Sequence, residues 1–268
     1  MQVIGLCRFS YSAEGGFQVR HETNAERAAY LYAPARMKAR LASFETMTLP
    51  ALRAQSDPDF TLLILTGEDL PEPYLDRLLT LTEDMPQAVI IQRPPGPHRA
   101  VCRDVMTGAR HDYASPCIQF RMDDDDAVAV DFVARLRADA AMVAPLCEAS
   151  PSVILDYRRG LIIRPTAQGP MGKEVELAYY PMAMGMVIAG RSGRSIMNFA
   201  HSKVAGFMPT VTFSDSLMFV RGHDDFNDSR QGASIKPMDL PLMDKAAEAL
   251  LYERFAIRAD HIRQCFAE

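Results

Sequence analysis

Short apolar runs alternate with longer amphipathic stretches through the first half of the chain. The runs predict buried strands. The stretches between them, whose apolar residues recur every three or four positions, predict helices. Strands are expected over 2–9, 60–66, 88–92 and 117–122, and helices over 25–53, 74–81, 99–112 and 127–144. Pro34 and Pro50 should interrupt the first helix. Strand–helix alternation at this spacing is typical of a parallel, doubly wound sheet, so the predicted fold class is α/β.

The pattern changes after Ser150. Two apolar runs, 153–157 and 161–164, are joined by Arg158-Arg-Gly160 and predict a β-hairpin. A short helix is expected over 192–200 and a terminal helix over 245–266. No repeat or linker separates the two patterns. We therefore expect a single domain, 1–268, with two functional halves, 1–130 and 131–268.

Composition narrows the function classes. The chain is 48% hydrophobic and 24% charged, which is typical of a globular domain with a sizeable core. Its net charge of −5 does not suit a dedicated nucleic-acid binder, so no nucleic-acid partner is expected. The five cysteines form no CxxC pair and are expected to be structural thiols in a reducing compartment. With neither a signal peptide nor a transmembrane segment recognisable, a cytoplasmic protein is expected.

The run Asp123-Asp-Asp-Asp126 directly follows the fourth predicted strand. If the run is extended, Asp123 and Asp125 share one face, and Asp124 and Asp126 share the other. Like charges 4 Å apart repel by about 1 kcal/mol in water and by several times more near a protein surface. Open α/β sheets bind ligands at the carboxyl ends of their strands, and a divalent cation, Mn²⁺ or Mg²⁺, would compensate carboxylates there. A solvated acidic turn, or a cluster capping the next helix, is the alternative.

An apolar strand followed by Asp-x-Asp and a helix resembles the DxD signature of GT-A-class nucleotide-sugar glycosyltransferases. Other segments are similar to the bacterial rhamnosyltransferase family. They are Arg8-Phe9, Arg36–Leu41 with Phe44 and Leu49-Pro50, Gln55 ahead of Phe60, Arg121–Val128, and His223–Ser229. The resemblance spans most of the chain. One departure is Met218-Phe219, where the family often has Trp, and this chain contains no Trp.

The resemblance implies a three-layer α/β/α GT-A-like fold with a mostly parallel central sheet. It also implies transfer of a sugar, rhamnose or another hexose, from a nucleoside diphosphate donor to a saccharide or other hydroxyl acceptor, for polysaccharide or glycoconjugate synthesis. The half 1–130 would bind donor and metal, and 131–268 the acceptor. Asp123 would lie near the donor ribose, and Asp125 would hold the cation on the diphosphate with Asp126 adjacent. The expected donor-binding residues are Arg8, Phe9, Arg121, Asp123 and Asp124, and the expected metal ligands are Asp123, Asp125, Asp126 and His223.

Several supporting residues have two interpretations each. His223 either completes the metal shell, as a late histidine often does in GT-A-like enzymes, or is an ordinary loop residue. Asp215 and Asp225 are candidates for the general base of an inverting transfer, or are ordinary loop aspartates; a retaining transfer would need no such base. Arg99 and Arg103, one helical turn apart, either reach the donor phosphates or form a solvated helix face.

Rival functions fit less well. A nucleotidyltransferase would share the fold and the metal, but the loop after the first strand has only a late Gly15-Gly16 pair. A GxxxxGK[ST] phosphate loop does not occur. A nucleotide-binding module on the same fold, without glycosyl transfer, is the alternative from a different class.

Overall fold

A computed structural model describes residues 1–15, 21–226 and 238–267, so Gly16 and the 227–229 part of the His223–Ser229 motif lie outside the described residues. The strands are β1 (Gln2–Arg8), β2 (Thr61–Gly67), β3 (Ala88–Arg93), β4 (Cys117–Asp123), β5 (Ala127–Val128), β6 (Ser152–Thr166), β7 (Gly169–Glu176), β8 (Met184–Ile188) and β9 (Thr210–Gly222). The α-helices are α1 (Asn24–Leu31), α2 (Pro34–Ser43), α3 (Leu49–Arg53), α4 (Glu72–Thr82), α5 (His98–Gly108), α6 (Phe132–Met142), α7 (Ala144–Ala149), α8 (Lys245–Phe255) and α9 (Ala259–Ala267). A π-helical turn, η1 (Phe44–Thr48), joins α2 to α3, and the 3-10 turns are η2 (Pro181–Ala183), η3 (Ile196–Asn198) and η4 (His201–Gly206).

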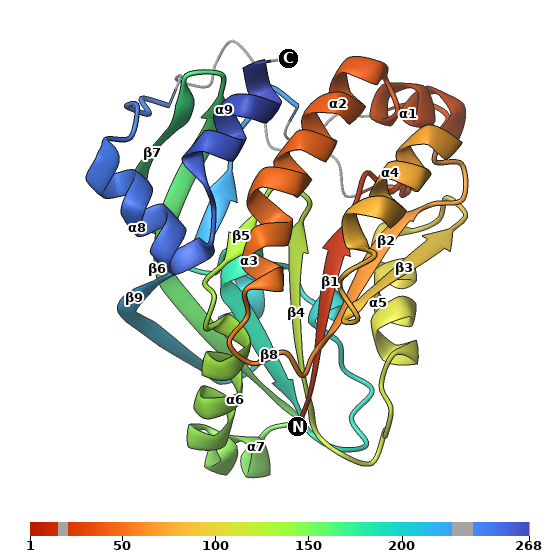
Figure 1. Cartoon of the computed structure of the whole chain (residues 1–268). Coiled ribbons are helices and arrows are strands. Elements are labelled where there is room, and N and C mark those ends of the chain that lie inside the picture. Colours follow the sequence, from red (N-terminus) through yellow and green to blue (C-terminus); the bar gives the residue numbers. More distant parts are fainter. Residues whose placement is uncertain (16–20, 227–237, 268) are drawn as a thin grey trace.

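The strands form one sheet in the order β3-β2-β1-β4-β8-β6-β9-β5, with β7 paired to β6. Strands β1 to β4 are parallel to one another, so their carboxyl ends meet at one edge (Figure 1). The expected α/β fold and its parallel strand–helix half are confirmed. Because β4 also pairs with β8, residues from both expected halves share this sheet.

The second half of the sheet is mixed. Strand β8 runs antiparallel to both β4 and β6, whereas β6 and β9 are parallel. The hairpin expected at Arg158-Arg-Gly160 is wrong, because β6 continues through these residues and forms its hairpin with β7. Gly160 permits the continuous strand: a Cβ there would lie 2.4 Å from the Phe219 carbonyl oxygen of neighbouring β9. The glycine was therefore a sign of close strand packing, not of a turn.

Helices cover both faces of the sheet. Most of them, including α2, α3, α4 and α6, pack on one face, and α2 to α4 lie in front of the parallel strands in Figure 1. On the other face, α5 packs with the 3-10 turns η3 and η4. Alternation along β1 illustrates the division, because Val3 and Cys7 belong to the first core cluster and Ile4 and Leu6 to the second. The result is a three-layer arrangement.

Three expected helices have different boundaries. The 25–53 segment divides at Pro34 and contains the π-helical turn η1. The 127–144 helix begins late, because Ala127–Val128 forms strand β5 against β9. The terminal helix breaks at Ala256, which has φ of 55° in the left-handed region and separates α8 from α9. No helix in the described ranges has the length and apolarity that crossing a bilayer requires.

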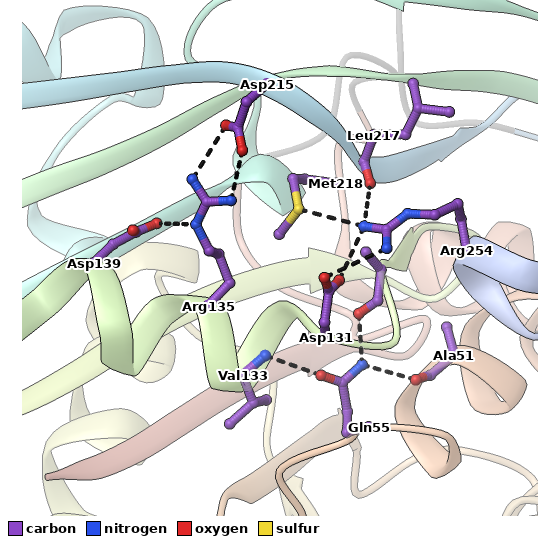
Figure 2. A network of polar contacts seen from close by, with 11 residues as sticks. Ala51, Gln55, Asp131, Val133, Arg135, Asp139, Asp215, Leu217, Met218 and Arg254 are labelled. Carbon is purple, nitrogen blue, oxygen red and sulfur yellow. Dashed lines mark hydrogen bonds and ion pairs between the residues drawn. The ribbon is translucent and has the colours of Figure 1, made fainter.

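Gln55 fixes the segment that follows the acidic run (Figure 2). Its side-chain amide donates to the carbonyl oxygens of Ala51 and Ala129, each at 2.8 Å, and its Oε1 accepts the N–H of Val133 at 3.0 Å. Gln55 is buried, so water cannot replace these bonds. This residue, quoted above for its resemblance to the family, thus ties α3 to the connection between β5 and α6.

We expect Gln55→Ala to lower the free energy of unfolding by about 2 to 4 kcal/mol, because it leaves buried backbone groups without partners. Gln87→Ala is the matched control. Gln87 makes one solvent-exposed bond to the Pro58 carbonyl, and its loss should cost less than about 1 kcal/mol. Urea denaturation of both variants measures the difference. Equal, small losses would contradict the role given to Gln55.

Candidate functional site

A cavity of about 240 Å³ opens at the carboxyl edge of the parallel strands, on the α5 face of the sheet. It lies between the ends of β1 and β4, the start of α5, and the segment around η2 to η4. Its lining residues are Leu6, Arg8, His98, Arg99, Cys102, Arg121, Met122, Asp123, Pro181, Met197, Ala200 and His201. Open α/β sheets bind ligands at this edge, and residues of both halves of the chain contribute to the wall.

Asp123 is the aspartate of the run that lines the cavity. Arg8 and Asp123 are paired in the strand register, and Arg8 Nη2 donates to Asp123 Oδ1 at 3.0 Å. Desolvation opposes ionisation of Asp123, but the guanidinium groups of Arg8 and Arg40 outweigh it and lower the pKa of this carboxyl. The Asp123 side chain is 46% exposed, so it is an ionised carboxylate accessible from the cavity.

Two arginines give the cavity an excess of positive charge. Arg121, on β4, donates to Met197 Sδ at 3.4 Å, and burial lowers its pKa to about 10, which leaves it charged at neutral pH. Arg99 lies in the first turn of α5. Neither guanidinium has an ion-pair partner among the described residues. A charged guanidinium that is held in a cavity wall without an ion-pair partner is well suited to an anionic ligand.

Two neutral histidines complete the wall. Burial and the charge of Arg8 lower the pKa of His98 to about 3, so its Nε2, 3.5 Å from Arg8 Nη1, is an acceptor at neutral pH. His201 Nδ1 lies 2.7 Å from the Tyr179 carbonyl oxygen. A carbonyl can only accept, so Nδ1 carries the proton and Nε2 of the neutral ring has a lone pair. Burial also lowers the pKa of His201.

The remaining aspartates of the run do not continue the strand. Asp126 N donates to Asp123 O at 3.3 Å, so Asp123–Asp126 is a turn, and the extended geometry expected there is wrong. Asp126 is buried, and its two carboxylate oxygens accept the backbone N–H groups of Asp123 and Gly222, each at 3.2 Å. Burial and the neighbouring charges of Asp125 and Asp123 raise the pKa of Asp126 well above its usual range.

Arg40, on α2, is the cation that faces the turn. It is buried, its Nη2 donates to Asp124 Oδ1, and its Nη1 lies 3.0 Å from Asp125 Oδ2 and 3.7 Å from Asp224 Oδ2. Asp124 and Asp125 are themselves 2% and 6% exposed. Part of the charge compensation that the sequence assigned to a metal is thus supplied by a side chain of the protein.

The acidic run offers a divalent cation few unengaged protein ligands. Within the described part of the chain, no aspartate of the run belongs to a group of three metal-binding side chains whose ligand atoms lie close together. Asp125 is engaged with Arg40 and Asp126 with backbone N–H groups. His223 follows β9 with Nδ1 unbonded among the described residues, and desolvation lowers its pKa, so its ring is neutral. An ion at this edge would find Asp123 as the cavity-lining carboxylate of the run and would take most of its ligands from phosphate oxygens and water, as Mg²⁺ commonly does.

Other expected site residues lie elsewhere. Phe9, expected to contact the donor, is fully buried and packs edge-on against Phe44 with ring centroids 5.3 Å apart, so it belongs to the core. Asp124, also expected at the donor, faces Arg40 and does not line the cavity. Arg103 is exposed and pairs with Asp104.

The two base candidates are paired with arginines. Asp215 accepts two hydrogen bonds from Arg135, at 2.8 and 3.1 Å, which lower its pKa (Figure 2). It lies in β9 seven positions before Gly222, which places it about 20 Å along the strand from the acidic turn. Asp225 accepts from Arg164 at 2.7 and 2.8 Å. Neither carboxylate lines the cavity.

Sequence reasoning assigned no role in the site to Arg40, His98 or His201. For Arg40 a signal existed: it lies one helical turn after Arg36 within the inward stripe that contains Met37 and Phe44, where a charged residue needs a buried partner. His98 and His201 had no comparable signal. They come together through the packing of α5 against the η2–η4 segment, which no local pattern indicates.

We expect Arg40→Met to lower the free energy of unfolding by about 3 to 5 kcal/mol at neutral pH, because it leaves buried carboxylates without their cation. The deficit should shrink as the pH falls, because burial raises the pKa of Asp224 and the variant lacks the Arg40 charge that lowers it, so protonation of Asp224 removes part of the uncompensated charge. Arg53→Met, which breaks the exposed pair with Asp84, is the control and should cost about 1 kcal/mol or less. Denaturation curves at several pH values measure both. A deficit that does not depend on pH would count against the electrostatic role.

Comparison with solved structures finds chains of low identity. TarS 1-349 of S. aureus is 10% identical, with 83% of this chain and 60% of that chain covered and a TM-score of 0.44. The same protein solved with UDP-GlcNAc is 9% identical, with coverages of 84% and 59% and a TM-score of 0.43. A Bacillus anthracis protein titled as a glucose-1-phosphate thymidylyltransferase is 11% identical, with coverages of 81% and 88% and a TM-score of 0.36. The chain thus spans about three fifths of the TarS 1-349 chains it matches.

Sequence comparison identifies the family of this chain. No curated protein matches the chain. A family model described as "Putative rhamnosyl transferase" matches residues 2–235, which include β1 to β9 and every residue of the cavity wall. The resemblance noted from the sequence is confirmed over nearly the whole chain. The protein belongs to the rhamnosyl transferase family of glycosyltransferases.

Proposed function

We propose that the protein transfers a sugar, rhamnose or another hexose, from a nucleoside diphosphate donor to a hydroxyl group of a saccharide or other acceptor, in the synthesis of a polysaccharide or glycoconjugate. Family membership supports glycosyl transfer. The observation that carries the donor class is the pair Arg99 and Arg121, two cations without carboxylate partners among the described residues, in a cavity beside Asp123. Residues 1–130 supply most of the donor site, and 131–268 supply the acceptor side.

The donor diphosphate occupies the basic part of this cavity. Its negative oxygens match the two guanidinium groups, which can each donate two hydrogen bonds to a phosphate. Arg8 is already paired with Asp123 and orients that carboxylate. Asp123 can then accept a hydrogen bond from a ribose hydroxyl, as the family resemblance implies. Transfer breaks the bond from the anomeric carbon to the phosphate oxygen, and the nucleoside diphosphate leaves with the electron pair.

A divalent cation, Mn²⁺ or Mg²⁺, accompanies the donor. Asp123 is the expected ligand that lines the cavity, whereas Asp125 and Asp126 have partners within the protein. The cation would therefore be bound chiefly by phosphate oxygens and Asp123, with Asp125 and His223 close behind the turn. Its chemistry would be to offset the negative charge of the leaving diphosphate.

We assign His201 as the general base that takes the proton of the acceptor hydroxyl. As the acceptor oxygen attacks the anomeric carbon, its proton passes to Nε2, the nitrogen whose lone pair is available because Nδ1 donates to Tyr179 O. Asp215 and Asp225, the sequence candidates, remain alternatives for this step in an inverting transfer. Each is paired with an arginine outside the cavity, which favours His201.

A nucleotide-binding module without transfer is the rival function. It would bind the same nucleotides through the same arginines but would release no nucleoside diphosphate from any sugar donor in the presence of acceptor. A turnover assay with candidate donors separates the two functions. Binding without turnover, for every donor that binds, would favour the module.

We expect one of UDP, GDP and dTDP to stabilise the protein, with a larger thermal shift when Mn²⁺ is present. A nucleotide at 100 times its dissociation constant should add about 2.7 kcal/mol. Arg121→Gln should abolish this shift, and Asp123→Asn should remove the Mn²⁺ enhancement. Arg103→Gln, which alters an exposed arginine of the same helix as Arg99, should behave as wild type. A full shift in Arg121→Gln would rule out the donor site as described.

We expect His201→Gln to lower kcat by about 10²- to 10⁴-fold with little change in the donor KM. Burial, Arg121 and Arg99 lower the pKa of His201, and they outweigh the Tyr179 carbonyl and Asp123. Since the neutral ring is the base, activity should fall only below the ordinary imidazole pKa of about 6.5. Asp215→Asn is the matched control and should keep wild-type kcat. Loss of activity in Asp215→Asn, but not in His201→Gln, would assign the base to Asp215.

A further inference from the structure

Outside the cavity, three potential metal ligands meet where the terminal helix packs on the π-helical turn. Glu45 lies in η1, and His261 and Cys265 lie one turn apart on α9. One ligand atom from each lies within 4.8 Å of the other two, and His261 Nε2 is 3.4 Å from Glu45 Oε1. In Figure 1, α9 runs beside α2, which η1 continues. The three side chains are half-buried, so an ion from solvent can reach them.

We propose that Glu45, His261 and Cys265 form a zinc site. The donor set is a carboxylate oxygen, an imidazole nitrogen and a thiol sulfur, which suits Zn²⁺ far better than Mg²⁺ or Mn²⁺, ions that prefer oxygen ligands. Zinc–ligand bonds of 2.0 to 2.3 Å in a tetrahedron place donor atoms roughly 3.3 to 3.7 Å apart. The separation between His261 and Glu45 already matches this spacing. Water would fill the fourth position.

The surroundings orient the ligands for this role. Arg77 Nη2 donates to Glu45 Oε2 at 2.6 Å, and this bond leaves Oε1 directed at His261. A second bond of this kind, which fixes a ligating group, is a common feature of metal sites. On α9, His261 and Cys265 are four residues apart and therefore share one face, next to the buried Ile262 that anchors the helix in the core.

The π-helical turn is a second, independent feature of the site. In η1 the N–H of Leu49 bonds to the carbonyl of Phe44, a five-residue step that widens the helix. Such turns are rare and frequently occur at functional sites. Here the turn carries Glu45 and directly follows α2, whose Arg40 compensates the acidic run. Zinc would thus fasten the terminal helix to the helix that supports the donor site.

Binding has a defined proton balance. The thiol of Cys265 loses its proton to solvent when the sulfur binds Zn²⁺, whereas His261 binds as the neutral ring and Glu45 as the carboxylate. No oxidation or reduction takes place. The ion is expected to stabilise the folded chain by an amount that grows with the logarithm of its affinity, since the ligands converge only when α9 packs on η1.

The test uses the whole 268-residue chain after chelation and without any nucleotide, so that its outcome does not depend on the donor site. Co²⁺ replaces Zn²⁺ as the probe. We expect one equivalent of Co²⁺ to give a thiolate-to-cobalt charge-transfer band. Added Zn²⁺ should then abolish this band by displacing the Co²⁺. Zn²⁺, but not Mg²⁺, should raise the melting temperature.

Cys265→Ser should lose the cobalt band, and His261→Gln should weaken zinc binding in competition with a chromophoric chelator. Arg77→Gln should weaken it by about tenfold through loss of the oriented carboxylate. Cys147→Ser alters another half-buried thiol on α7, at the opposite end of the molecule in Figure 1, and should behave as wild type. Circular dichroism checks that each variant is folded. The absence of a cobalt band in wild type, or an unchanged band in Cys265→Ser, would overturn the proposal.

Discussion

Several carboxylates brought together where water is largely excluded must be compensated by positive charge or by hydrogen bonds, and the acidic turn of this protein uses both. Arg40 faces Asp124, Asp125 and Asp224, and Arg8 holds Asp123. For Asp126, whose oxygens bind backbone N–H groups, burial and its neighbours raise the pKa. The rest of the site depends on this arrangement, because it turns the run into a fixed support that presents one carboxylate to the cavity.

The ion pairs of the acidic turn also leave different charges on the two faces of the sheet. On the α2 face, Arg40 faces carboxylates that outnumber it. On the α5 face, Arg99 and Arg121 have no carboxylate partner among the described residues. Asp123 lies at the boundary, at the end of β4, and is within reach of both environments. In the proposed transfer, the anionic diphosphate would therefore enter from the α5 side, and a divalent cation would bind between that diphosphate and Asp123.

The sequence predicted the parallel half of the fold well, because each of β1, β2, β3 and β4 is a continuous apolar run bounded by polar residues. It also located the acidic run at the correct sheet edge. It failed where long-range pairing decides the structure. Gly160 looked like a hairpin turn but is a point of close approach between β6 and β9. Ala127–Val128 looked helical but pairs with β9. The partners of Asp124 and Asp126, from α2 and from the end of β9, could not be predicted from local spacing, since they meet only in the folded chain.

The helical segment from α2 through η1 to α3 contacts both the acidic turn and α9. It carries Arg40 toward the acidic turn, Glu45 toward α9, and at its end leads to Gln55, which binds the segment after the turn. A displacement of this segment would alter the turn from both sides at once, at Arg40 and at the Ala129 carbonyl. Packed elements of this kind tend to shift as units, because their interiors are close-packed and resist continuous deformation. The turn that follows Asp123 is therefore supported by a helical segment that itself lines no part of the cavity, and contacts at η1 and α9 are joined to that turn through this segment.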